Sequence, residues 1–218
     1  RRGDRFDLAG RFNGAHYYDL ERRSDTSGDQ GHISYAYLDF VDRDLDISAR
    51  IGRQSQYTGG VLGRFDGMRL SYRWRPDVVI NGNVGFPTDS PRAALSTRRV
   101  FYGASVDFEN IADRWDFSAF FHLQNVDGIA DRQAIGGEAR YLRGNWNLVA
   151  MTDFDVSYNV LNSALMAATW QPTRRLSVNG RVNFGTSPFI ATRNALIGQL
   201  FTTVEGLQTL YTEGQLRR

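Results

Sequence analysis

The sequence contains no cysteine and no lysine. The lack of cysteine excludes disulfide frameworks, cysteine-ligated zinc, iron–sulfur clusters and thiol catalysis. All 26 basic residues are arginine, and aspartate outnumbers glutamate by 19 to 5, so the charged residues that favour helices are scarce. No run of about 18 apolar residues occurs, which excludes a transmembrane helix. The absence of lysine and the scarcity of glutamate argue against an all-helical fold.

Several functional motifs are also missing. The formal net charge of +2 over 218 residues is too balanced for a dedicated nucleic-acid binder, so we expect no nucleic-acid partner. The chain has no GxSxG nucleophile elbow, no P-loop and no dinucleotide fingerprint. The glycine-rich stretch 59–67, GGVLGRFDG, is interpreted as a loop that leads into a strand. The sequence therefore predicts a protein that is not an enzyme and has no cofactor and no metal site.

Alternation of apolar and polar side chains dominates the sequence. In residues 5–20, Phe6, Leu8 and Phe12 share one parity, while Asp7 and Arg11 share the other. This period of two is typical of strands with two unlike faces. The same pattern predicts ten further strands, near residues 32–41, 45–54, 66–74, 78–86, 99–108, 115–125, 133–142, 146–154, 160–170 and 176–184. In 33–40 and 164–170 the apolar parity is not defined by the pattern.

The connections between these strands alternate in length. Short ones carry turn residues and are expected near 42–44, 75–77, 109–114, 143–145 and 171–175. Long ones are expected near 20–31, 55–65, 87–98, 126–132 and 155–159. Because the two kinds interleave, the pattern predicts an antiparallel meander with short turns at one end and long loops at the other.

Strand length and aromatic position favour a membrane protein. Strands of about nine to eleven residues suit a tilted crossing of a bilayer, whereas soluble strands average about five or six. All four tryptophans lie near predicted short turns, where an indole suits a membrane–water boundary. We call the following residues the aromatic girdle: Trp74, Trp115, Trp146, Trp170, Tyr72 and Tyr141. A soluble β-sandwich binding module is the alternative, since it would also show alternation.

The fold class predicted is all-β: an antiparallel up-and-down transmembrane β-barrel of about 11–12 strands. Residues 1–185 would supply the strands, and 186–218 a loop and a short C-terminal helix. In that helix Leu200, Val204, Leu207 and Tyr211 recur at helical spacing. It would constrict the lumen or form part of an extracellular loop. Since bacterial single-chain barrels have even strand numbers, we expect the chain to be part of a larger barrel.

The alternation, the asymmetry of the connections and the aromatic girdle resemble those of Gram-negative outer-membrane β-barrel proteins over residues 5–185. The stretch 52–74, GRQSQYTGGVLGRFDGMRLSYRW, also resembles barrels fused to periplasmic helical repeats in exopolysaccharide export. The resemblance implies a bacterial outer-membrane channel or export duct for hydrophilic solutes or polysaccharide. Membrane lipid and periplasmic export components would be its partners.

Charged side chains on the polar parity are the candidate selectivity residues. Two groups are expected in the lumen. A deeper arginine belt comprises Arg11, Arg50, Arg69, Arg140 and Arg181, and an acidic mouth near the short turns comprises Asp7, Asp46, Asp107, Glu109 and Asp116. The alternative is that arginine and acid simply pair across neighbouring strands. A second functional hypothesis is a barrel enzyme with a rim site at His16 or His32, beside Asp25 and Asp29.

Overall fold

The computed structural model describes residues 4–18, 29–61 and 63–186, and this part of the chain is entirely β-structure and turns. Its strands are β1 Phe6–Tyr18, β2 Asp29–Asp42, β3 Ile47–Gln56, β4 Gly63–Arg75, β5 Val78–Thr88, β6 Arg99–Ile111, β7 Trp115–Val126, β8 Ile129–Arg143, β9 Trp146–Asp155, β10 Val160–Thr173 and β11 Leu176–Gly185. No helix that is long and apolar enough to cross a membrane occurs among these residues. The expected helix around Leu200–Tyr211 lies outside the described residues.

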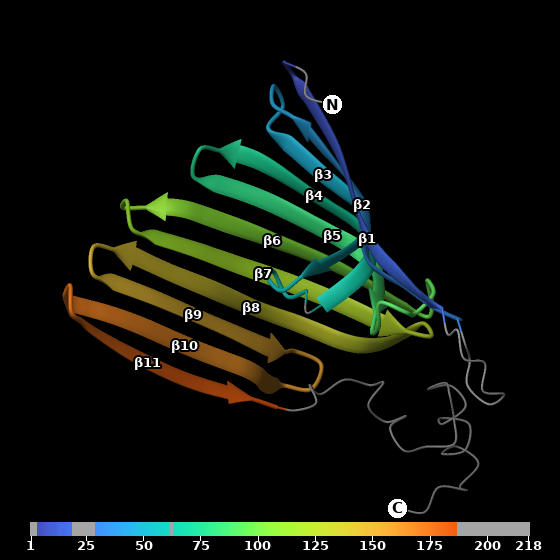
Figure 1. Ribbon diagram of the computed structural model, residues 1–218. Coiled ribbons are helices and arrows are strands. Elements are labelled where there is room, and N and C mark those ends of the chain that lie inside the picture. Colours follow the sequence, from blue (N-terminus) through green and yellow to red (C-terminus); the bar gives the residue numbers. More distant parts are fainter. Residues whose placement is uncertain (1–3, 19–28, 62, 187–218) are drawn as a thin grey trace, which may run out of the picture.

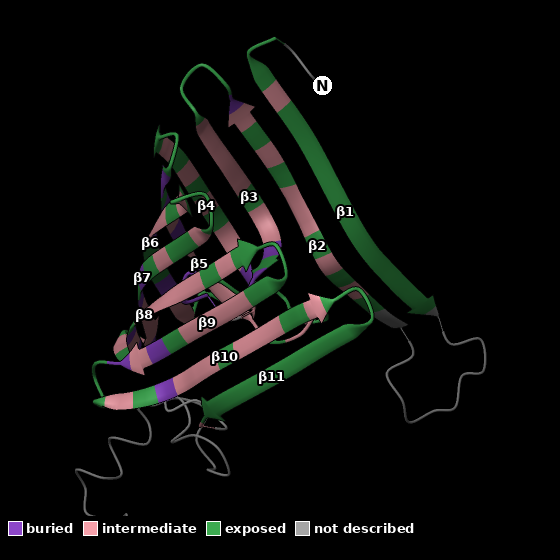
Figure 2. Ribbon diagram, turned by 90° about the vertical axis from the view of Figure 1, so that its left-hand side faces the viewer, coloured by how far each residue is buried: buried purple, intermediate pink, exposed green. Residues whose placement is uncertain are grey.

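All eleven strands form one antiparallel sheet in sequence order, so the predicted up-and-down meander is confirmed (Figure 1). The sheet is strongly curved, and its edges β1 and β11 flank an open side in Figure 2. Neither edge has a second partner strand within the described residues. The sheet is therefore compatible with a β-barrel, and the described residues do not close it.

The connections separate by length as predicted at 57–62 and 89–98, whereas 156–159 has four residues, as many as the turn 43–46, and 126–132 is an exception. Turns 43–46, 76–77, 112–114, 144–145 and 174–175 all join strands at one end. At the other end the connections 57–62 and 89–98 are long, whereas the expected long loop at 126–132 is wrong. There β7 and β8 continue to a two-residue turn, Asp127–Gly128, with φ of 51° and 80°. Two successive positive φ values are typical of a type I′ hairpin, which matches the strand twist.

Most strands are also longer than predicted, and the strands range from 10 to 15 residues. β8 is the longest because Ile129 to Arg132 belong to it rather than to a loop. At about 3.3 Å per residue, the longest strand extends roughly 50 Å, which exceeds the thickness of a bilayer's hydrocarbon core.

The sheet has no second layer packed against it within the described residues, because contacts run between neighbouring strands. Among the residues that the structure describes, Val61, Phe65 and Phe101 form the buried apolar cluster. Figure 2 shows alternating exposed and less exposed bands along the central strands, while β11 is exposed throughout and β1 is exposed apart from Asp7 over residues 6–17. The described residues thus form a single curved sheet with a convex and a concave face rather than a two-sheet sandwich.

Candidate functional site

The convex face is exposed and mostly apolar, and the Arg53–Asp66 ion pair lies on it toward the long-connection end. Side chains that share this face in register include Leu38, Ile51 and Met68, which are 52%, 58% and 41% exposed. The same face carries further large exposed apolar side chains: Phe6, Leu8, Phe12, Leu70, Ile80, Tyr102, Phe108, Phe117, Phe121, Ile135, Leu161, Met166, Val178, Val182 and Phe184. Soluble monomers rarely expose apolar patches larger than a few hundred Å². Exposed apolar side chains therefore recur on this face from one edge of the sheet to the other.

The aromatic girdle lies on this convex face at the short-turn end. Trp115 packs against Tyr141 with ring centroids 4.7 Å apart, and Trp146 stacks on Trp170 at 5.3 Å. Tyr72 shares the convex face with its register partners Ile47 and Ile80. Trp74 lies two residues beyond Tyr72 and is 56% exposed, with the Arg75 guanidinium over its ring. The structure therefore brings the six residues to one end of one face.

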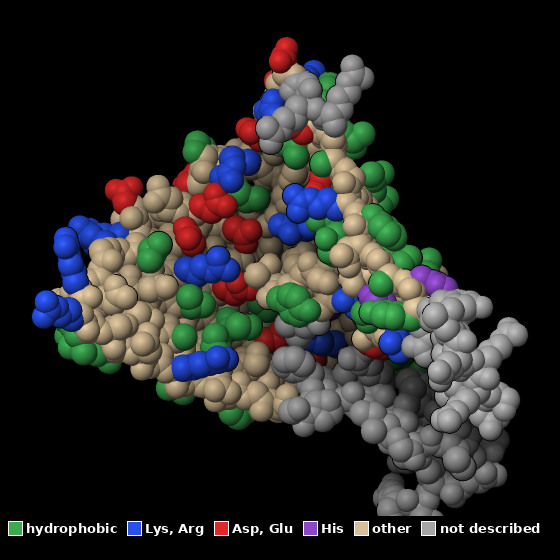
Figure 3. Space-filling model, in the orientation of Figure 1, with side chains coloured by type: hydrophobic (Ala, Val, Ile, Leu, Met, Phe, Trp, Pro, Cys, Tyr) green, Lys and Arg blue, Asp and Glu red, His purple; other side chains and the backbone are tan. Residues whose placement is uncertain are grey.

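The concave face is polar and charged. Acidic and basic side chains gather over the hollowed side of the molecule in Figure 3. Many of its polar side chains are buried, including Gln54, Asn81, Asn83, Ser105, His122, Arg132 and Asp153. Side-chain hydrogen bonds link several of them: Asn81 donates to Asp107 at 2.6 Å, and Ser118 donates to the other oxygen of Asp107 at 2.6 Å. The interior of the curve is thus a hydrogen-bonded polar surface rather than an apolar core.

Residues 57–61 of the β3–β4 connection lie across this concave face, and we call them the inward segment. The Gly59 N–H donates to Glu138 Oε1 at 3.3 Å, and Arg132 Nη1 donates to the Gly60 carbonyl at 2.8 Å, so β8 holds the segment. Val61 packs with Phe65 and Phe101, whose rings meet edge to face at 5.0 Å. His122 stacks on Phe101 at 5.1 Å beneath the segment. The glycine-rich stretch is therefore a loop that leads into β4, but it is held inside the curve.

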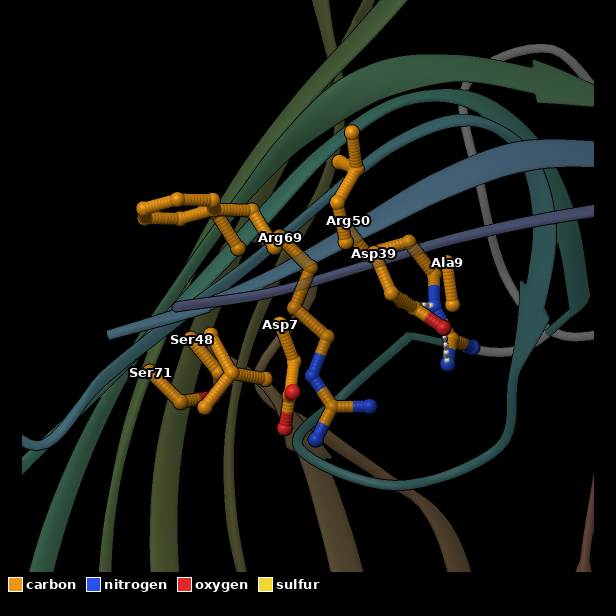
Figure 4. Close-up of a pocket in the computed structure, with 11 residues that line it drawn as sticks. Asp7, Ala9, Asp39, Ser48, Arg50, Arg69 and Ser71 are labelled. Carbon is orange, nitrogen blue, oxygen red and sulfur yellow. Dashed lines mark hydrogen bonds and ion pairs between the residues drawn. The ribbon is translucent and has the colours of Figure 1, made fainter. Parts of the chain in front are cut away.

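A cavity of about 510 Å³ lies on the concave face between β1, β2, β3 and β4. Figure 4 shows Arg50, Arg69, Asp7, Asp39, Ser48 and Ser71 around it. Arg50 makes two bonds to Asp39, at 2.6 and 3.1 Å, and its guanidinium lies over the Tyr37 ring at 4.0 Å. Arg69 stands directly opposite Arg50 in the strand register. We call this space the arginine cavity.

The other members of the predicted arginine belt are less closely grouped. Arg140 lies 3.9 Å from Glu138 on its own strand. Arg11 and Arg181 lie on the edge strands β1 and β11, far from each other in the strand order. Arg50 is paired with Asp39, as the cross-strand alternative expects. The five arginines therefore share the concave face without forming one continuous ring.

The predicted acidic mouth does lie near the short turns, but it is not purely acidic. Asp7 pairs with Arg43, and Glu109 pairs with Arg73 at 2.8 Å. Asp116 accepts a hydrogen bond from the Asn110 N–H at 2.9 Å. Asp46 is in the β2–β3 turn with φ of 52°, and Asp107 is held by Asn81 and Ser118. Arginines interleave with these acids, so this rim carries mixed charge.

His16 and His32 lie together at the long-connection end. Both line a groove on the convex side with Phe12, Ile33 and residues 91–95. Arg53 anchors these residues, since it donates to the carbonyls of Pro91 and Ala93. Within the described ranges no group of three or more His, Cys, Asp or Glu side chains is placed to hold a metal ion. Asp25 lies outside these ranges.

Three concave-face residues were not predicted from the sequence. Asp39 lies in a segment where both parities carry apolar side chains, so its face was undefined. Arg132 and its buried partner Asp153 were missed because Arg132 was assigned to a loop. The Asp-Gly pair at 127–128 is the signal that could have corrected that assignment.

No protein-family model matches the chain, and a search of curated proteins returns no match. The described residues define a class of architecture: a curved antiparallel meander that is apolar outside and polar inside.

Proposed function

We propose that the chain forms part of a β-barrel channel in a bacterial outer membrane and passes hydrophilic solutes or polysaccharide. The observation that carries this proposal is the inverted distribution of side chains. Leu70, which is 43% exposed, faces outward, while its neighbours Arg69 and Ser71 face inward around the arginine cavity. Lipid would cover the convex face, and water would fill the concave side.

Backbone hydrogen bonding supports the same placement. In lipid every backbone N–H and C=O needs an internal partner, and the central strands of this sheet are paired on both sides. The aromatic girdle would lie at one membrane–water boundary, where rings with polar atoms are favoured. In this proposal β1 and β11 pair with further strands, so that no edge remains exposed to lipid.

The inward segment would limit the width of the channel. It is held from β8 at Gly59 and Gly60 and covers part of the concave surface of β6 and β7. The mixed-charge rim at the short turns would form one entrance. Arginine and aspartate side chains along the wall would keep the path hydrated and bind solutes weakly enough to release them.

Reconstitution into planar lipid bilayers tests this function. We expect discrete conductance steps from the purified, detergent-solubilised protein, together with a shift of its band in SDS gels after boiling. A boiled sample is the control. A protein that stays monodisperse in buffer without detergent, or that gives no conductance in bilayers, would contradict the proposal.

A further inference from the structure

We propose that the arginine cavity binds a hydroxylated carboxylate, such as a sugar acid, with Arg69 holding the carboxylate. This inference rests on the proposed function, because the cavity must open to water. It adds a specific ligand class and a specific residue to a channel that otherwise passes solutes by size and charge.

The charges around the cavity leave Arg69 without a direct partner. Asp39 is engaged by both bonds of Arg50, and Asp7 pairs with Arg43. No hydrogen bond or ion pair of the Arg69 side chain occurs among the described residues. In the strand register Arg69 faces another cation, Arg50, on β3 and Asn83 on β5. Like charges directly opposite each other on a sheet are unfavourable, so an anion bound at Arg69 would relieve this repulsion.

Arg69 is also placed to reach a solute. It lines the arginine cavity on one side and a second cavity, of about 180 Å³, on the other. In Figure 4 its guanidinium points into the space around which the labelled side chains lie. A planar guanidinium with no partner can hold both oxygens of a carboxylate through two parallel bonds.

The rest of the wall favours hydroxyl groups on the ligand. The Ser71 hydroxyl already donates to Asn81 at 2.6 Å, so its oxygen remains available as an acceptor. The Ser71 oxygen can therefore accept a hydrogen bond from a hydroxyl of a sugar. A volume of about 510 Å³ falls in the range of small-molecule sites.

The charge balance favours a monoanion. Both acids that line the arginine cavity have their own arginine, so Arg69 is the charged group of this cavity that has no ion-pair partner among the described residues. A single carboxylate would neutralise it, whereas a second negative charge would face Asp7 and Asp39. This distinguishes the proposed ligand from a phosphate dianion.

Titration calorimetry of the whole chain in detergent micelles tests the site with three probes: glucuronate, glucose and acetate. We expect glucuronate to bind more tightly than glucose, which lacks the carboxylate, and than acetate, which lacks the hydroxyls. Arg69→Gln should weaken glucuronate binding by roughly 10- to 100-fold, the usual cost of losing a hydrogen bond to a charged group. Arg69→Lys should recover only part of the affinity, because lysine keeps the charge without the planar fork.

Arg181→Gln is the matched control. It removes the same charge from the concave face, but on the edge strand β11, which does not line the arginine cavity. It should leave glucuronate affinity unchanged, and the heat shift in SDS gels should show that each variant folds. Equal glucuronate affinity in the wild type and Arg69→Gln, or equal affinity for acetate and glucuronate, would overturn the inference. The channel proposal fails separately, through absent bilayer conductance, while calorimetry still decides the binding site.

Discussion

Arg132 on β8 donates a 2.8 Å hydrogen bond to the carbonyl oxygen of Gly60, a residue 72 positions earlier in the chain. The same guanidinium forms a buried ion pair with Asp153 on β9. One side chain therefore joins the inward segment to the wall of the sheet. The position of that segment depends on this contact and on the close approach of Gly60 to β7.

Replacing Gly60 with alanine should displace the inward segment and raise the single-channel conductance. A Cβ at this position would lie 2.6 Å from Phe120 and 2.9 Å from His122, and the φ of 77° is unfavourable for alanine. Gly128→Ala is the control, because it has φ of 80° but nothing within 4 Å of the added carbon. Conductance in planar bilayers that is unchanged by Gly60→Ala would show that the segment does not limit the path.

Removing either member of the Arg132–Asp153 pair should destabilise the sheet strongly. Their side chains are only 7% and 3% exposed, so Arg132→Gln would leave a buried carboxylate without its cation. Such losses are typically about 3–5 kcal/mol, whereas replacing both partners with apolar residues costs less. Urea unfolding in micelles, followed by tryptophan fluorescence, measures the difference between Arg132→Gln and the double variant Arg132→Met with Asp153→Leu.

Arg98 provides an exposed comparison for that experiment. Its hydrogen bonds with Asp127 raise the pKa of the Arg98 guanidinium, which therefore stays charged. Arg98 is 47% exposed, so water can replace its partner, and Arg98→Gln should change the unfolding midpoint far less than Arg132→Gln. Equal midpoints for these two variants would contradict a stabilising role for the buried pair.

Single cysteines can report which face meets water, because the chain has no native cysteine. In vesicles a water-soluble thiol reagent should label Ser71→Cys and not Leu70→Cys. If exposure in the structure alone decided the labelling, Leu70→Cys would react faster than Ser71→Cys, because Leu70 is the more exposed residue and Ser71 is half-buried. Faster labelling of Leu70→Cys in vesicles would place the convex face in water and refute the lipid contact.

The aromatic girdle predicts the depth of tryptophan fluorescence. All four tryptophans lie at the short-turn end, so lipids brominated near the headgroup should quench them more than lipids brominated near the chain end. Trp115→Phe should lower the total signal and keep the same ratio between the two lipids. Quenching by aqueous iodide with none from either lipid would argue against a membrane boundary.

Most of the eleven strands were predictable because they have a clear local period of two, which sets their two faces without any distant information. The predictions that failed concern contacts between residues distant in the sequence, or the geometry of a turn. Asp39 could not be assigned to a face because Tyr35 and Tyr37 on one parity compete with Leu38 and Phe40 on the other. Its partnership with Arg50 follows only from the register of β2 and β3.

The inward segment shows the same limit at longer range. Nothing near Gly60 in the sequence indicates contact with Arg132, since the bond arises only when the sheet curves and brings β8 opposite the β3–β4 connection. The glycine pattern did indicate a loop. The direction in which the loop folds was set by the tertiary contacts with Phe120, Phe101 and Glu138.

The order of the strands restricts how the two free edges can be satisfied. Since neighbours alternate in direction and the sheet begins and ends on odd-numbered strands, β1 and β11 point the same way. If β1 and β11 paired directly, their pairing would be parallel. The pairing of β11 of one copy with β1 of another copy in the same orientation would be parallel too. Only an odd number of intervening strands would give antiparallel hydrogen bonding at both edges.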